Sequence, residues 1–166
     1  MEWGTPVLFS RIADGILFKS AHDTTGIRRR LSVFLCHAAE DKEFVRKLYQ
    51  RLTMDGYDVW IDEERILPGA VWETEITRAM RSSHVVIVCL SKKAVTKTGF
   101  VQKEIAMALD TLQEQPEGMI YLIPAKIEEC NTPERLKHLQ FVRIDDETGY
   151  RRLLASLAQR KEDLRL

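Results

Sequence analysis

One acidic side chain in the stretch TKTGFVQKEIAMALD, residues 96–110, stands where it could meet a ligand. If a helix begins near Phe100, Glu104 lies about 90° from the centre of the buried stripe, with Phe100 one turn earlier on the same side. The apolar residues of that stripe are Val101, Ile105, Ala108, Leu109 and Leu112. Lys103 and Asp110 should point to solvent. The spacing thus predicts a carboxylate and an aromatic ring together at a helix start, although Glu104 could also be an ordinary acid that the first turns of a helix favour.

Composition limits the classes of protein to which this stretch can belong. The chain has 166 residues, enough for one compact domain, with 45% hydrophobic and 30% charged residues. Lys+Arg and Asp+Glu both number 25, and this zero net charge argues against a nucleic-acid partner. The three cysteines are odd in number and widely spaced, which indicates reduced, buried thiols and a cytoplasmic protein. No apolar stretch approaches the ~20 residues that cross a bilayer, so no membrane partner is expected.

Strand and helix patterns alternate after residue 30. Apolar runs rich in strand formers predict strands at 31–36, 57–62, 84–91, 118–127 and 139–145, with helical spacing between most of them. Only a turn or so of helix is expected in EECNTPERLKH, residues 128–138. This pattern predicts an α/β fold: a flavodoxin-like three-layer sandwich with a parallel sheet of order 2-1-3-4-5 and helices on both faces.

The ends of the chain lie outside that pattern. Residues 1–30 are interpreted as an extension or linker of unknown role, 31–160 as the domain and 161–166 as a tail. The run Arg28-Arg29-Arg30 is interpreted as a solvated lead-in to the first strand, with a phosphate or an acidic partner as the alternative.

The predicted strand order also predicts where a ligand would bind. In such a sheet the crevice opens at the carboxyl ends of the first and third strands, where the chain order reverses. Three segments border it: CHAAED after the first strand, DEERILPGAVW after the second, and SKKAVTKTGF, which leads into the Glu104 helix.

Several common sites of this fold are excluded by the residues at that edge. The strand ends Cys36-His37 and Leu90-Ser91 lack the acids of a phosphate-accepting receiver domain, and CHAAEDK has no glycine for a flavin phosphate. No dinucleotide or P-loop glycine motif is present. Cys36 and His37 lack two further zinc ligands, so no metal is expected. A catalytic thiol at Cys36 is disfavoured because a buried strand should contain it.

Four motifs, in order and spacing, resemble a bacterial-type TIR (Toll/interleukin-1 receptor) domain. They are VFLCHAAEDKEFV, VWIDEERILPGAVWETEI, VVIVCLSKKAV and FVQKEIAMAL, and the resemblance covers about residues 31–160. Many members of that family cleave NAD+ at the nicotinamide–ribose bond with a glutamate in a W-x-x-x-E pattern. Here the pattern reads Phe100 to Glu104, with phenylalanine in place of tryptophan, and a phenylalanine can still stack on a flat ring.

The resemblance also implies roles for other residues. Glu104 would be the catalytic residue, and NAD+ would be the substrate, with no further cofactor. The substrate-contacting set would be Phe100, His37, Ala38, Asp62, Arg65, Leu67, Ser91 and Lys92. Arginines that some active members have near His37 are missing, so Arg65, Lys92 or Lys93 would contact the phosphates.

Assembly is a further implication of the resemblance. Residues 62–69 match the family's BB loop, which gates the site and joins neighbouring TIR domains into a homo-oligomer or filament. Trp72, just beyond, is predicted to pack in the core because it falls on the apolar face of its helix, and a partner contact is the alternative. The resemblance implies an assembly-activated NAD+ glycohydrolase of bacterial antiphage defence, or else a non-catalytic scaffold that recruits other TIR domains.

Overall fold

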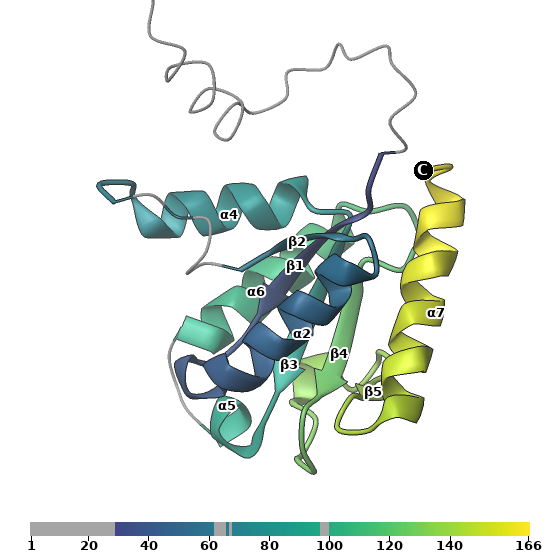
Figure 1. Ribbon diagram of the computed structural model, residues 1–166. Coiled ribbons are helices and arrows are strands. Elements are labelled where there is room, and N and C mark those ends of the chain that lie inside the picture. Colours follow the sequence, from purple (N-terminus) through teal and green to yellow (C-terminus); the bar gives the residue numbers. More distant parts are fainter. Residues whose placement is uncertain (1–28, 62–65, 67, 97–99) are drawn as a thin grey trace, which may run out of the picture.

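A five-stranded parallel sheet forms the centre of the molecule (Figure 1). This is a computed structural model, and the description covers residues 29–61, 66, 68–96 and 100–166. The strands are β1 (Ser32–Cys36), β2 (Asp58–Trp60), β3 (Val85–Leu90), β4 (Leu122–Lys126) and β5 (Val142–Arg143). They lie in the order β2-β1-β3-β4-β5, and every neighbouring pair is parallel. The strand order predicted from the alternation of elements is therefore confirmed.

Helices connect successive strands of the parallel sheet, except that a single 3-10 turn links β4 to β5. The helices are α2 (Lys42–Met54), α4 (Trp72–Ser82), α5 (Lys92–Thr96), α6 (Phe100–Gln113) and α7 (Glu147–Asp163), with short 3-10 turns η1 (Ala39–Asp41) and η2 (Glu134–Leu136). Gly56 follows α2 with φ of +91°, a conformation that glycine adopts without strain and that ends the helix. The single turn η2 between β4 and β5 confirms the short link expected there.

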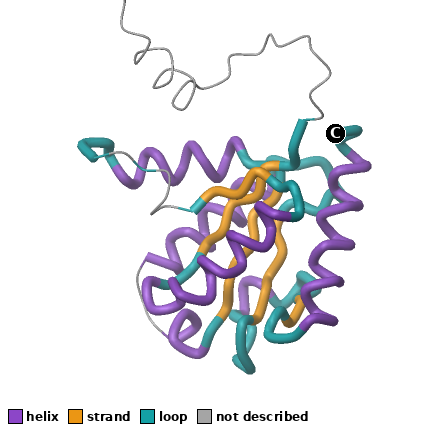
Figure 2. The backbone as a smooth tube through the Cα atoms, viewed as in Figure 1, coloured by secondary structure: helices purple, strands orange, loops and turns teal. Residues whose placement is uncertain are grey.

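The sheet is buried on both faces because its strands alternate their side chains between two cores. In β1, Val33 and Leu35 pack with α2 and α7, whereas Phe34 and Cys36 pack with α4 and α6. Figure 2 shows the strands between these two helical layers. Every residue of β3 is buried, as expected of a central strand in a parallel sheet that is covered on both faces. The alternation within β1 matters for function because it points Cys36 toward the layer that contains α6.

The start of α4 differs from the prediction. Ile76 and Met80 are buried, but Val71 is 69% exposed and Trp72 is 39% exposed. Core packing of Trp72 was therefore the wrong prediction. Trp72 is the first residue of the helix, and the helix meets the core only from Ile76 onward. Helical periodicity identified the apolar face but not the point along the helix at which that face reaches the core.

Candidate active site

The Glu104 carboxylate lies against the end of β1. Glu104 is the fifth residue of α6, and its side chain is only 3% exposed. The Cys36 thiol, on the last residue of β1, donates a hydrogen bond of 2.9 Å from Sγ to Glu104 Oε2. The contact follows from local structure. Because Ile105 and Ala108 of α6 pack in the core, Glu104, the residue before Ile105, lies over the end of β1. A buried carboxylate thus stands at the carboxyl edge of the sheet, where ligands bind in this class of fold.

This placement corrects one expectation from the sequence. Glu104 was predicted at the boundary of the buried stripe, facing an open crevice, but it belongs to the buried face itself. The buried face of α6 contains Glu104, Ile105, Ala108 and Thr111, so it is rotated toward the acid. Both polar members have partners, since Thr111 Oγ1 donates to the Met107 carbonyl at 2.9 Å. The prediction used apolar residues only, so it left out Glu104 and Thr111 and underestimated how far the buried face extends.

A second acid joins the two loops that follow β1 and β3. Asp41, the last residue of η1, is 9% exposed, and its Oδ2 accepts a hydrogen bond of 2.7 Å from Ser91 Oγ. Ser91 is 2% exposed, and its Oγ also accepts the Ala94 amide at 3.0 Å, which caps the start of α5. This pair, which we call the Asp41–Ser91 brace, holds together two segments predicted to border the site. The Ser91 hydroxyl thus bonds to protein in this structure, and its predicted contact with substrate stays a prediction.

The remaining predicted site residues are partly buried at the end of β1, partly exposed at the start of α5, and partly outside the described residues. His37 and Ala38 are buried at the end of β1, 8% and 3% exposed. Lys92 and Lys93 are exposed at the start of α5, where the Lys92 amide donates to Glu128 Oε1 at 2.7 Å. Asp62, Arg65 and Leu67 lie outside the described residues, and Phe100 is described only as the first residue of α6.

Negative charge gathers at this edge of the sheet. Burial, together with the nearby charges of Asp41 and Glu104, raises the pKa of the Cys89 thiol to about 12. One strand farther along, Lys126 is 7% exposed; its Nζ donates to the Cys130 carbonyl at 2.7 Å and lies 4.1 Å from the centre of the Phe141 ring. This buried cation is thus engaged within the protein. All three cysteines are buried and free of disulfides, as their spacing predicted.

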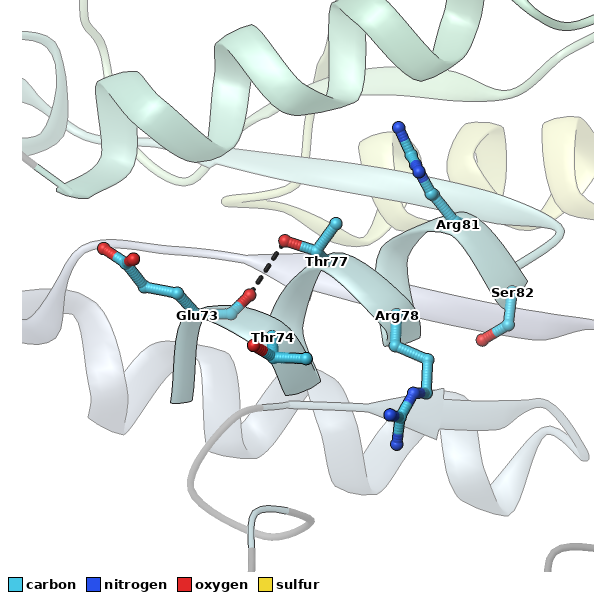
Figure 3. A pocket seen from close by; sticks show the side chains of 6 residues that line it. All are labelled: Glu73, Thr74, Thr77, Arg78, Arg81 and Ser82. Atoms are coloured by element: carbon cyan, nitrogen blue, oxygen red, sulfur yellow. Dashed lines mark hydrogen bonds between the residues drawn. The ribbon is translucent and has the colours of Figure 1, made fainter. Parts of the chain in front are cut away.

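A surface hollow of about 700 Å³ lies elsewhere, along α4. It is wide open, and its described lining comprises Glu73, Thr74, Thr77, Arg78, Arg81 and Ser82, all on that helix (Figure 3). Arg78 pairs with Glu75 at 3.0 Å, and Arg81 lies 3.9 Å from Glu114. The hollow does not include Glu104, so shape and chemistry indicate different places. We place the candidate site at Glu104 because a carboxylate at the strand ends offers specific chemistry, whereas an open hollow on one helix with paired charges does not.

The described residues contain no group of three or more His, Cys, Asp or Glu side chains that could hold a metal ion. No helix within the same ranges is both long enough and apolar enough to span a membrane.

The sheet order and the helices on both faces define a flavodoxin-like α/β domain. The family model of the TIR domain matches residues 33–154, and the chain belongs to this family. Among solved structures, the TIR domain of a Toll-related receptor from Hydra magnipapillata is similar, with TM-score 0.63, 22% identity, and coverage of 76% of this chain and 97% of that one. A prokaryotic SEFIR domain gives TM-score 0.59 at 17% identity, covering 76% of this chain and 91% of that one. At these identities the two structures support the fold alone.

Two curated proteins resemble the chain in sequence. The NAD(+) hydrolase TcpA of a Theionarchaea archaeon is 42% identical over 94 residues, which cover 55% of this chain and 27% of that protein. The uncharacterized protein y4cD of Sinorhizobium fredii is 30% identical over 101 residues, covering 60% of this chain and 16% of that protein. The chain therefore spans less than a third of the length of either relative.

Proposed function

We propose that this TIR domain cleaves NAD+ at the nicotinamide–ribose bond, with Glu104 as the catalytic residue. The observation that carries the proposal is the Glu104 carboxylate, held against the end of β1 at the ligand-binding edge of the fold. The 42% identity to a protein named as an NAD(+) hydrolase supports the same chemistry. The products would be nicotinamide and either ADP-ribose or a cyclic form of it.

A single carboxylate is enough for this reaction. When the C1–N bond of the ribose breaks, the electron pair stays on the nicotinamide nitrogen, which loses its positive charge and needs no proton. The ribose C1 becomes cationic, as in glycoside cleavage. An ionised Glu104 near this carbon stabilises the developing charge. Water then adds at C1 and loses a proton to give ADP-ribose, whereas attack by the adenine or a hydroxyl of the same molecule gives a cyclic product.

The burial of Glu104 supports activation by assembly. At 3% exposure the carboxylate is closed to substrate in the isolated chain, so neighbouring protein must move before NAD+ can reach it. Residues 62–69 would couple that movement to contact with another TIR domain. Of these, Pro68 and Gly69 are described, and both are exposed. We place this reaction in the cytoplasm of a bacterium, in antiphage defence.

The same burial favours a second candidate, a scaffold without catalysis. Glu104 would then be a core carboxylate whose partners, Cys36 among them, satisfy it, and the domain would only recruit other TIR domains. The two candidates differ in what removal of the Glu104 charge does to turnover of NAD+.

The deciding experiment measures nicotinamide released from NAD+ by chromatography, over a series of protein concentrations. Catalysis by Glu104 predicts that Glu104→Gln lowers the rate about 10²–10³-fold, equivalent to ~3–4 kcal/mol of transition-state stabilisation. Asp110→Asn is the matched control, because it removes one negative charge from an exposed position of the same helix. Its rate should equal that of the wild type, and the rate per chain should rise with protein concentration. Equal release by wild type and Glu104→Gln, or release by neither at any concentration, would favour the scaffold.

A further inference from the structure

We propose that Cys36 is a positioning residue that fixes the orientation of the Glu104 carboxylate for reaction. This role rests on the proposed function. The thiol would act through Glu104 and would not itself touch the substrate.

The sulfur of Cys36 is a fixed point. Cys36 is 0% exposed and ends β1, which is paired on both sides, with β2 and with β3. Its Cα is in register with that of Val88 in β3. The alternation of the strand points its side chain into the same core as Ile105 of α6. Backbone pairing and packing thus determine where Sγ lies, and the carboxylate of Glu104 meets it at 2.9 Å.

A buried cysteine ordinarily needs no role beyond packing, because it behaves as a small apolar residue. Cys89 fits that description: it is 0% exposed in the adjacent strand β3 and packs in the opposite core. Cys36 differs because its thiol donates to a carboxylate that is itself buried. Valine could fill the space, but it would remove a donor from a buried carboxyl group, and such a loss is costly.

The chemistry of the donor suits the reaction. A lysine or arginine in this place would also hold the carboxylate, but its positive charge would compete with the cation that forms on the ribose. A thiol is neutral and orients the carboxylate without cancelling its charge. A group held in place before the bond breaks needs little reorganisation in the transition state, and that is where fixed charges contribute most.

The test compares Cys36→Ala, Cys36→Ser and Cys89→Ala by steady-state turnover of NAD+, with thermal unfolding measured for each. Cys36→Ala should lower kcat about tenfold to a hundredfold, the usual effect of losing a hydrogen bond to a charged group, while KM stays within about twofold. Cys36→Ser keeps a donor and should restore kcat to within about fivefold of the wild type. Cys89→Ala makes the same truncation in the other core and should leave kcat unchanged.

Two further measurements separate positioning from packing. In the Glu104→Gln background, Cys36→Ala should not reduce the residual rate further, since the charge to be oriented is gone. The infrared S–H stretching band of Cys36, assigned by its loss in Cys36→Ala, should move to higher frequency in Glu104→Gln because a neutral amide is a weaker acceptor than a carboxylate.

The outcomes separate this role from the proposed function. If the wild type is active but Cys36→Ala keeps its kcat, or Cys89→Ala loses as much, Cys36 has no positioning role and the function stands. If Cys36→Ala lowers the residual rate of Glu104→Gln by the same factor as it lowers kcat of the wild type, the positioning role is overturned as well. Absence of turnover by the wild type overturns the proposed function and the positioning role together. If the S–H stretching frequency is the same in the wild type and in Glu104→Gln, the contact between Cys36 and Glu104 is itself overturned.

Discussion

Truncation of the Asp41–Ser91 brace should destabilise the loops that carry the site. Ser91→Ala removes two hydrogen bonds, one to the Asp41 carboxylate at 2.7 Å and one from the Ala94 amide at 3.0 Å. A bond to a charged group contributes about 1.5–3 kcal/mol and a helix cap about 1 kcal/mol. Ser91→Ala should therefore cost about 2.5–4 kcal/mol, and Asp41→Ala, which breaks the first bond only, about 1.5–3 kcal/mol.

The pair can be tested by a double-mutant cycle in urea unfolding at pH 7. Because both single variants break the same bond, the double variant should be more stable than the sum of the two losses predicts, by about 1.5–3 kcal/mol. The cap should persist in Asp41→Ala, so α5 should stay ordered there and loosen only when Ser91 is replaced, which hydrogen exchange at Ala94 would detect. Strictly additive losses would refute the brace, since two residues that share one bond cannot contribute independently.

Two predictions concern stability away from the site. In Gly149→Ala the new Cβ would overlap the carbonyl oxygen of Arg143. This backbone clash should outweigh the ~1 kcal/mol that alanine gains over glycine in a helix, so the melting temperature should fall. The control Thr148→Ala, at an exposed position of the same helix, should leave the melting temperature equal or higher. Burial, helped by Arg160, lowers the pKa of His84, whose neutral Nδ1 accepts a backbone amide at 2.9 Å. The folded state therefore binds this proton less readily than the unfolded chain, so His84 should contribute stability that is complete well above pH 6.5 and is lost as pH falls below it. Urea midpoints from pH 8 to pH 5 should show this loss in the wild type and less of it in His84→Gln, and identical profiles would contradict the assignment.

The fold could be predicted from the sequence because its determinants are local and repeated. Each strand is a short apolar run, most intervening helices show apolar spacing, and Gly56 follows α2 with a positive φ that ends the helix. The order of the strands then follows from the few ways in which such units can pack. The exposure at the start of α4 was not predicted, because periodicity determines which residues share a face but not where along its length a helix leaves the core.

The site was less predictable because its contacts join segments that are far apart in the sequence. Glu104 was identified as the residue of interest, but its burial depends on how far α6 is rotated over β1, and apolar spacing alone does not fix that rotation. Asp41 and Ser91 lie 50 positions apart and have no shared short-range signal. Cys36 was set aside as a buried strand residue, and it is one, yet its thiol meets the carboxylate. The alternation of β1 could have indicated which core it faces, though not its partner.

The burial of Glu104 has different consequences for an enzyme and for a scaffold, because an enzyme must spend free energy to open the site and assembly can offset that cost. An ionised carboxylate costs several kcal/mol to bury, and its hydrogen bonds offset that cost in the closed state. Under the proposed function, an opening cost of about 3 kcal/mol would leave fewer than ~1% of isolated chains open at any moment and would lower the apparent affinity for NAD+ by the same factor. Contact with another TIR domain can remove that penalty only to the extent that it binds the open form more tightly than the closed one. Under the proposed function, a buried carboxylate that becomes accessible on assembly would therefore keep the isolated chain nearly silent. A scaffold is compatible with the burial but has no use for the charge, since an apolar side chain of similar size would fill the same place at lower cost.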